Sequence, residues 1–155
     1  MLNTSEMLAR AIAFAAQQHQ GQFDKAGRPY VLHCLKVMHY LKSDDDELAA
    51  IAVLHDVVED TGATYQDLTQ LGMSDRVVQG IRCMTKLPGQ TPDEYLQQVL
   101  SNHDSVLVKM ADLRHNSDIR RLKGVTDKDI RRVEKYNKMY NTLKQALKDF
   151  GKNGR

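Results

Sequence analysis

The segment from Leu48 to Thr61, with the sequence LAAIAVLHDVVEDT, combines an apolar run with side chains that bind metals or transfer protons. Its aliphatic residues recur at helical spacing, which predicts a helix that faces the core. The polar residues that interrupt the run are His55, Asp56, Glu59 and Asp60. Residues four apart share one face of a helix, so we expect two polar columns. One is formed by His55 and Glu59, and the other by Asp56 and Asp60. Carboxylates buried there need a positive partner, and a divalent metal ion would supply it.

A metal site at this segment requires ligands from other parts of the chain. His55 and Asp56 provide two ligands, whereas a divalent ion takes roughly four to six. His33 is the best upstream candidate and Asp112 the best downstream candidate, because each interrupts an otherwise apolar helical segment. Two imidazoles and two carboxylates form a mixed nitrogen and oxygen set, which suits manganese, iron or magnesium and also accommodates zinc.

The second acidic pair, Glu59 and Asp60, lies one turn beyond the predicted ligands. A carboxylate at that place can take a proton from water that the metal activates, or orient that water for attack on phosphorus. Lys25, Arg28 and Lys86 lie on loops or helix ends, where they could neutralise a phosphate group. The simpler alternatives are that the acids cap a helix end and that the basic residues are solvated loop charges. The pattern favours hydrolysis of a phosphate ester or anhydride.

Length and charge limit the classes of protein to which the chain could belong. Its 155 residues predict one domain, over residues 1–150 with a frayed tail at 151–155, and such a chain buries roughly 70% of its unfolded surface. Lys and Arg number 22 and Asp and Glu 20, for a net charge of +2. This balance argues against a dedicated nucleic-acid or membrane binder, although it is compatible with a local basic pocket.

Cysteine usage and the first residues indicate the compartment. Cys34 and Cys83 lie in apolar helical contexts and form neither a CxxC motif nor a disulfide framework. We expect two buried thiols in a reducing cytoplasm. The N-terminal stretch MLNTSEMLARAIAFAAQQ is periodically rather than continuously apolar, so we expect a structural helix and not a signal peptide.

The rest of the chain is predicted to be a succession of helices joined by short polar turns. The expected helices begin near Ser5, Pro29, Ser43, Thr64, Ser74, Thr91, Asp104 and Thr126, where capping residues or prolines precede apolar periodicity. The first is expected to reach His19 or Gln20 and the second Leu41, and the third is expected to run unbroken through Thr61 to Gly62. No strand alternation or internal repeat is present, so the sequence predicts an all-α, compact helical bundle.

Four ordered segments carry a resemblance to a known family: GQFDKAGRPYVLH, AVLHDVVEDT, CMTKL and VKMADLRHNSDI. Their order resembles the HD-domain metal-dependent phosphohydrolases. It is most similar to the hydrolase domain of the RelA/SpoT family and to the stand-alone guanosine-tetraphosphate hydrolases of the Mesh1 type. The match extends from about Ala9 to Tyr140, and its specificity lies in the recurrence of all four segments in order.

The resemblance implies an all-helical fold that holds one manganese ion and removes the 3′-pyrophosphate from guanosine tetraphosphate or pentaphosphate. By motif position, the family's metal ligands fall on His33, His55, Asp56 and Asp112, and its catalytic acid pair falls on Glu59 and Asp60. Its substrate contacts fall on Lys25, Lys86, Asn116 and Tyr136.

Two departures from the family pattern leave the substrate open. Asp24 stands where the family has the first residue of a basic pair, and Leu113-Arg114 stands where it has Arg-Leu. Three functions follow from the sequence: a manganese-dependent pyrophosphohydrolase of guanosine polyphosphates, a phosphohydrolase of another nucleotide or phosphoester, and a non-catalytic nucleotide-binding module. The acid pair argues against the third, because binding alone would not require it.

Overall fold

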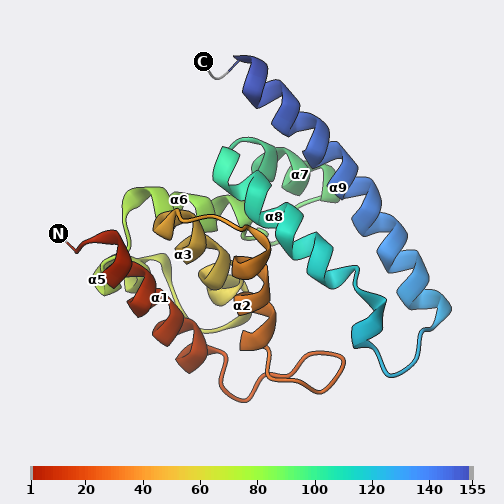
Figure 1. Cartoon of the computed structure of the whole chain (residues 1–155), viewed down its shortest axis with the longest axis horizontal. Coiled ribbons are helices and arrows are strands. Elements are labelled where there is room, and N and C mark those ends of the chain that lie inside the picture. The colour runs from red at the N-terminus through yellow and green to blue at the C-terminus, as the bar shows by residue number, and fades with distance from the viewer. Residues whose placement is uncertain (1, 154–155) are drawn as a thin grey trace.

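The computed structural model describes residues 2–153, and these residues form an all-helical fold, as predicted (Figure 1). The elements are α1 (Thr4–Gln18), α2 (Val31–Tyr40), α3 (Asp46–Leu54), α4 (Val57–Asp60), α5 (Tyr65–Leu71), α6 (Asp75–Met84), α7 (Pro92–Leu100), α8 (His103–Asn116), the 3₁₀ turn η1 (Ile119–Arg121) and α9 (Asp127–Asn153). Within the described residues, extended pairing is limited to an isolated bridge between Phe23 and Pro29.

Helix α3 lies at the centre of the larger part of the fold (Figure 1). All its residues from Leu48 to Leu54 are buried, and it packs against α1, α2, α6 and α8. A helix that is apolar on every side is stable only when other elements surround it, which explains why this segment forms the core. Its start is fixed by Asp45, whose side chain accepts hydrogen bonds from the backbone N–H groups of Glu47 and Leu48.

Helix α8 joins this core to a second apolar cluster formed with α7 and α9. Val108 and Ala111 face the first cluster, whereas Val106 and Leu113 pack in the second, against Leu143 of α9. The long helix α9 runs along one side of the molecule, next to α7 and α8 (Figure 1). Because α8 packs against both apolar clusters on different sides, its polar side chains are held at fixed positions.

Several helix starts were predicted correctly from capping residues. Thr64 and Asp67 form a reciprocal capping box at α5, and Ser74 caps α6. Thr91 caps α7 ahead of Pro92. In each case a side-chain oxygen accepts a backbone N–H that has no partner inside the helix.

The predicted continuous central helix is wrong: it breaks after Leu54, at the pair His55 and Asp56, and α4 begins at Val57. In an unbroken α-helix the backbone carbonyl of Ala52 would accept the N–H of Asp56. Here that carbonyl oxygen lies 2.6 Å from Nδ1 of the His55 ring and 3.4 Å from the His55 backbone nitrogen. The His55 side chain thus replaces a bond of the helix ladder, so the two expected polar columns do not form one continuous face.

Further helix starts differ from the prediction: Asp45 and not Ser43 caps α3, and Asn102 caps α8 ahead of the expected start at Asp104. Asn3, and not Ser5, caps α1, because its side chain accepts the backbone N–H of Glu6 while the Ser5 hydroxyl donates to Asp46. Helix α2 begins after Pro29, which pairs with Phe23 in the isolated bridge and therefore does not occupy the first helical turn.

Helix α9 continues through Gly151 to Asn153, and the expectation that the tail 151–155 frays stays a prediction. The last two residues, 154–155, lie outside the described part of the chain. None of the helices within residues 2–153 combines the length and the apolar character that crossing a bilayer requires.

The close contact between α3 and α6 gives a test of this core. A Cβ atom added at Gly80 would lie 2.6 Å from Cδ1 and 3.0 Å from Cγ1 of the fully buried Ile51. We expect Gly80→Ala to lower the free energy of unfolding by about 1–3 kcal/mol, because overpacking outweighs the gain in helix propensity. Urea denaturation would measure this. Gly124→Ala is the matched control, since a Cβ there meets no atom within 4 Å; equal stability of the two variants would contradict this packing.

Candidate metal centre

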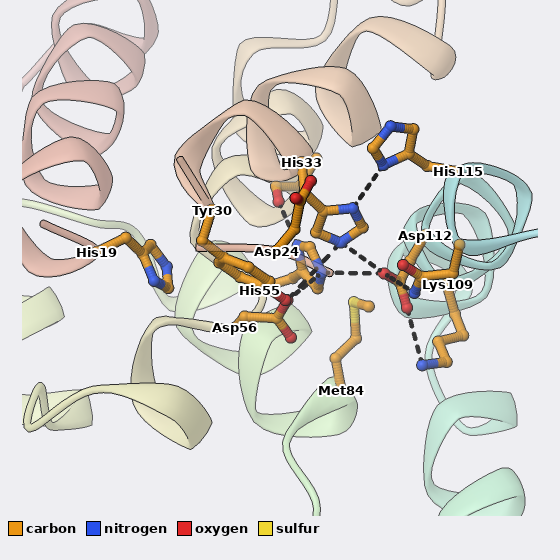
Figure 2. Close-up of polar contacts among 12 residues, drawn as sticks. His19, Asp24, Tyr30, His33, His55, Asp56, Met84, Lys109, Asp112 and His115 are labelled. Carbon is orange, nitrogen blue, oxygen red and sulfur yellow. Dashed lines mark hydrogen bonds and ion pairs between the residues drawn. The ribbon is translucent and has the colours of Figure 1, made fainter. Parts of the chain in front are cut away.

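The four predicted metal ligands come together at the break between α3 and α4 (Figure 2). His33 reaches the site from α2 and Asp112 from α8, while His55 and Asp56 form the break itself. One ligand atom of each residue lies within 4.8 Å of those of the other three. Both histidines are 2% exposed and Asp112 is 4% exposed, whereas the Asp56 side chain is 17% exposed, so bulk water reaches the cluster mainly at this carboxylate.

The spacing of the ligand atoms suits a single ion. Two atoms that bind one ion at about 2.1 Å and at right angles lie roughly 3 Å apart. The observed separations are 2.9 Å from His55 Nε2 to Asp56 Oδ2 and 2.9 Å from His33 Nε2 to Asp112 Oδ1. The two longer separations are 3.4 Å, from His55 Nε2 to Asp112 Oδ1, and 3.8 Å, from His33 Nε2 to Asp56 Oδ2.

The hydrogen bonding of His55 provides a chemical test of whether a cation fits. A carbonyl oxygen only accepts hydrogen bonds, so the contact with Ala52 requires a proton on His55 Nδ1. In the neutral ring Nε2 then carries a lone pair, and this buried atom has no hydrogen-bond partner among the described residues. It faces the carboxylates of Asp56 and Asp112, which also only accept. Acceptors that converge in a buried place need a positive centre between them, so the residues fit a metal ion.

The pKa directions indicate the same requirement. Burial alone would lower the pKa of His55, but Asp56 and Asp112 outweigh burial and hold it well above the usual range. Burial would raise the pKa of Asp112, but Lys109, His33 and His55 hold it well below its usual range. The cluster therefore stabilises positive charge at His55 Nε2, whether a proton or a metal ion supplies it.

A buried lysine offsets part of the negative charge of the cluster. Lys109 lies one turn before Asp112 on α8, and its Nζ donates to Asp112 Oδ2 at 2.9 Å. Burial would lower the pKa of Lys109, but Asp112 and Tyr95 raise it above its usual range, so the ammonium group stays charged. The other oxygen of Asp112 accepts a hydrogen bond from Asn116 Nδ2 at 3.0 Å. These two contacts fix the carboxylate toward the cluster.

Other polar groups orient the remaining predicted ligands (Figure 2). The Tyr30 hydroxyl donates to Asp56 Oδ2 at 2.5 Å. His33 Nδ1 lies 2.7 Å from Nδ1 of His115, so one ring donates to the other and His33 Nε2 is directed to the cluster. Burial, Arg121 and His33 lower the pKa of His115 to about 4, so at neutral pH its ring is uncharged and can accept this hydrogen bond.

The predicted catalytic acids lie beside the cluster. Carboxylate oxygens of Asp56, Glu59 and Asp60 lie within 4.8 Å of one another. Glu59 Oε1 accepts the backbone N–H of Lys86 at 2.8 Å, which ties α4 to the loop after α6. Burial and the neighbouring carboxylates of Asp56 and Glu59 raise the pKa of Asp60 to about 6. A carboxyl group with that pKa can exchange protons near neutral pH.

A hollow of about 290 Å³ adjoins the cluster. It is the larger of two hollows that His33 lines, and we call it the larger hollow. Three of the predicted substrate contacts, Lys25, Asn116 and Tyr136, line it together with His33. The fourth, Lys86, is not among its lining residues. Its Nζ lies 5.3 Å from the centre of the Tyr95 ring, and it reaches the site through its backbone contact with Glu59.

The two departures from the family pattern have structural consequences. Asp24 Oδ2 accepts a hydrogen bond from Arg121 at 3.2 Å, so the negative charge is paired with an arginine distant in sequence. Leu113 packs in the second core and Arg114 lies over the ring of Tyr40, 4.4 Å from its centre. Arg114 therefore does not line the larger hollow.

Sequence reasoning missed several residues of the site. Lys109 could have been found, because a charged residue interrupts an apolar run three positions before Asp112 and shares its face. Tyr30 was not among the predicted site residues, although its hydroxyl donates to Asp56. His19 lies at the C-terminal end of α1 and is 2% exposed, and its Nδ1 lies 2.8 Å from Gln22 Oε1. Gln22 in turn donates to the backbone oxygen of Asp60, which fixes the end of α4.

Comparison with known proteins shows the family to which the chain is similar. The family profile described as HD domain matches residues 11–143. The bifunctional (p)ppGpp synthase/hydrolase SpoT of Escherichia coli K12 is 35% identical over 122 residues, which are 70% of this chain and 17% of that protein. The guanosine-3′,5′-bis(diphosphate) 3′-pyrophosphohydrolase MESH1 of Danio rerio is 32% identical over 126 residues, which are 74% of this chain and 69% of that protein. The chain thus spans about a sixth of the SpoT relative and about two thirds of the MESH1 relative.

A solved structure has the same fold. It is described as a metazoan ortholog of SpoT that hydrolyzes ppGpp and plays a role in starvation responses. The TM-score is 0.67 at 23% sequence identity, and the match covers 94% of this chain and 96% of that one.

The site makes a prediction about protons and metal binding. In the metal-free protein the raised pKa of His55 keeps a second proton on the ring, at Nε2, near neutral pH. A metal ion that binds Nε2 must displace this proton. We expect manganese to bind with release of about one proton per ion near pH 7, and the apparent affinity to fall as the pH is lowered. Calorimetry in buffers of different ionisation enthalpy would count the protons.

The variants for this test are matched on α2. His33→Gln should abolish high-affinity metal binding, whereas His39→Gln, at an exposed position of the same helix, should retain it. A binding enthalpy that does not depend on the buffer would contradict the assignment of His55.

Proposed function

Because the chain belongs to the HD domain family, we propose that it is a metal-dependent phosphohydrolase that removes the 3′-pyrophosphate from guanosine tetraphosphate or pentaphosphate. The observation that carries the proposal is the convergence of His33, His55, Asp56 and Asp112 around a buried point, with Asp60 beside them. The named activities of the SpoT and MESH1 relatives support the choice of substrate.

We assign the metal-binding role to His33, His55, Asp56 and Asp112, and we propose manganese as the native ion. Mixed imidazole and carboxylate ligands suit this ion, and water can fill the remaining coordination positions. When bound, a divalent ion supplies Lewis acidity that lowers the barrier to attack by water on phosphorus. The free thiols of the buried residues Cys34 and Cys83 support a reducing, cytoplasmic setting.

We assign proton transfer to Asp60. We assign to Glu59 the orientation of water or of the leaving group. With a pKa raised to about 6, Asp60 is ionised at neutral pH yet basic enough to accept a proton from the attacking water. One carboxylate oxygen of Glu59 accepts the backbone N–H of Lys86, and this hydrogen bond holds α4 against the loop after α6. Its other oxygen remains to orient water or the leaving group.

The larger hollow suits the nucleoside part of the substrate. Its apolar and aromatic walls are formed by Phe23, Tyr30, Ile119, Leu122, Val133 and Tyr136. Polar groups at its margin, among them Lys25 and Asn116, can bind the base or ribose by hydrogen bonds. Asn116 also contacts Asp112, so a substrate held by this amide would lie next to the metal ligands.

A phosphohydrolase of another nucleotide is the second candidate, and the pair Asp24 and Arg121 favours it. At this margin the chain presents a carboxylate and a guanidinium, where the resemblance led us to expect a basic pair. Such an exchange alters which base edge the hollow can recognise. A binding module without activity is disfavoured by the acid pair Glu59 and Asp60 beside the proposed ligands, because binding alone would not require it.

The decisive experiment measures product release by the purified protein with manganese. We expect pyrophosphate from guanosine tetraphosphate, and little reaction with the 5′-triphosphates GTP and ATP. Reaction with other nucleotides alone would select the second candidate. The absence of reaction with every substrate, while manganese is bound, would select the binding module.

The acid pair gives a sharper test of mechanism. We expect Asp60→Asn to lower kcat by about 10²- to 10⁴-fold, the range typical of a lost general base, without loss of metal. We expect Glu59→Gln to lower kcat as well. In the unmodified protein kcat should fall at acidic pH, because protonated Asp60 cannot accept a proton; the pKa of Asp60 is about 6 without metal, and a bound cation shifts this fall to lower pH.

Metal content by atomic absorption separates this role from a structural one. Asp67→Asn is the control, because it removes an exposed carboxylate of the α5 cap, away from the cluster. If Asp60→Asn keeps full turnover, the assigned role of Asp60 is wrong.

A further inference from the structure

A second hollow, of about 250 Å³, shares the wall residues Asp24, His33 and Arg121 with the larger hollow, and we call it the basic hollow. Its remaining lining residues are Ala26, Arg28, Leu32, Lys36 and His115. We propose that the basic hollow is a binding site for a phosphate-bearing anion.

The balance of charge in the basic hollow is the first observation. Arg28, Lys36 and Arg121 bring three positive charges, whereas Asp24 brings one negative charge. Both oxygens of Asp24 are already engaged: Oδ1 accepts the backbone N–H groups of Ala26 and Arg28, and Oδ2 pairs with Arg121. Within the described side chains, neither Arg28 nor Lys36 forms an ion pair with a carboxylate. The hollow therefore holds positive charge that the protein does not neutralise.

The geometry of Arg121 is the second observation. Its Nη2 donates to Asp24 Oδ2 at 3.2 Å and its Nη1 donates to the backbone oxygen of His115 at 3.0 Å. Its side chain is 23% exposed. Two contacts from different elements thus fix the guanidinium before any ligand arrives, and its other N–H groups remain for an anion. A fixed, planar guanidinium matches phosphate oxygens and loses little conformational entropy on binding them.

The larger hollow does not have this excess of charge. It is lined by three aspartates, Asp24, Asp118 and Asp129, and by three basic residues, Lys25, Arg121 and Arg132. Arg132 pairs with Asp129 and Arg121 with Asp24, so little positive charge is left for a ligand. A phosphate group is therefore better accommodated in the basic hollow, and a nucleoside in the larger one.

The position of the basic hollow links it to the metal centre. Its wall includes His33, a proposed metal ligand, and His115, which contacts His33 Nδ1 at 2.7 Å. An anion bound here would lie against the residues that orient this ligand. Two sources share the required chemistry: the 5′-phosphates of the substrate, and free pyrophosphate or phosphate. The choice between them rests on the proposed function, whereas the existence of the anion site does not.

Calorimetry with inorganic pyrophosphate and metal-free protein tests the site directly. We expect the double variant Arg28→Gln and Lys36→Gln to bind pyrophosphate at least about tenfold more weakly, since each charge-assisted contact contributes enough to change affinity by that factor. The control is the double variant Lys123→Gln and Lys128→Gln. It makes the same change in net charge at two exposed positions outside both hollows and should leave the dissociation constant unchanged.

The result that overturns the proposal is equal affinity in the two double variants, or no binding by the unmodified protein. Circular dichroism would establish that each variant is folded. Because all four substituted side chains are exposed, loss of the fold is not expected.

Steady-state kinetics distinguish the two sources of phosphate. If the hollow binds the substrate's own 5′-phosphates, the Arg28 and Lys36 variant should raise KM for guanosine tetraphosphate but not for guanosine 3′-diphosphate, which lacks them. If it binds a free anion, both KM values should stay the same and inhibition by added pyrophosphate should weaken. Unchanged KM values together with unchanged inhibition would count against the site. If neither nucleotide is hydrolysed, calorimetry still decides whether the anion site exists, so the two proposals fail separately.

Discussion

The structure depends on one constraint: several hydrogen-bond acceptors converge at a largely buried point, where bulk water reaches mainly the partly exposed Asp56. His55 Nε2 faces the carboxylates of Asp56 and Asp112, and His33 Nε2 completes the group. Such an arrangement is costly without a cation, and it persists only if the surrounding fold holds each residue in place. The apolar helix α3 and the two-sided burial of α8 provide that support.

The break between α3 and α4 shows how the fold meets this constraint. A continuous helix would leave the Ala52 carbonyl bonded to the Asp56 N–H, and the His55 ring would then lose the acceptor that fixes its tautomer. By taking this carbonyl, the ring fixes Nδ1 as the protonated nitrogen and presents the lone pair of Nε2 to the cluster. The helix loses a backbone bond, and buried Leu54 and Val57 on either side hold the interrupted segment in the core.

The sequence indicated the residues to which we assign metal binding, but not the way they are held. His55, Asp56 and Asp112 could be found because polar residues inside apolar helical runs are conspicuous. The break was missed because helical periodicity continues through it, and only a side-chain contact with Ala52 replaces the backbone bond. The pair of Asp24 with Arg121 joins residues 97 positions apart, and periodicity does not predict such contacts. Local patterns thus determine element types and caps, whereas pairings between loops depend on how the whole chain packs.

The distribution of charge explains why metal and phosphate binding should be coupled. With neutral imidazoles, Asp56 and Asp112 bring two negative charges to the cluster, and Lys109 compensates one of them. The metal-free cluster would then repel a phosphate group, unless protonated His55 removes the remaining charge. A divalent ion reverses the sign and makes the cluster attractive to anions, and the basic hollow beside His33 extends that positive region. Because Asp60 lies at the edge of this region, the ion also favours the ionised form of its carboxyl group. Binding of the ion would therefore prepare both the proposed phosphate site and the carboxyl group to which we assign proton transfer.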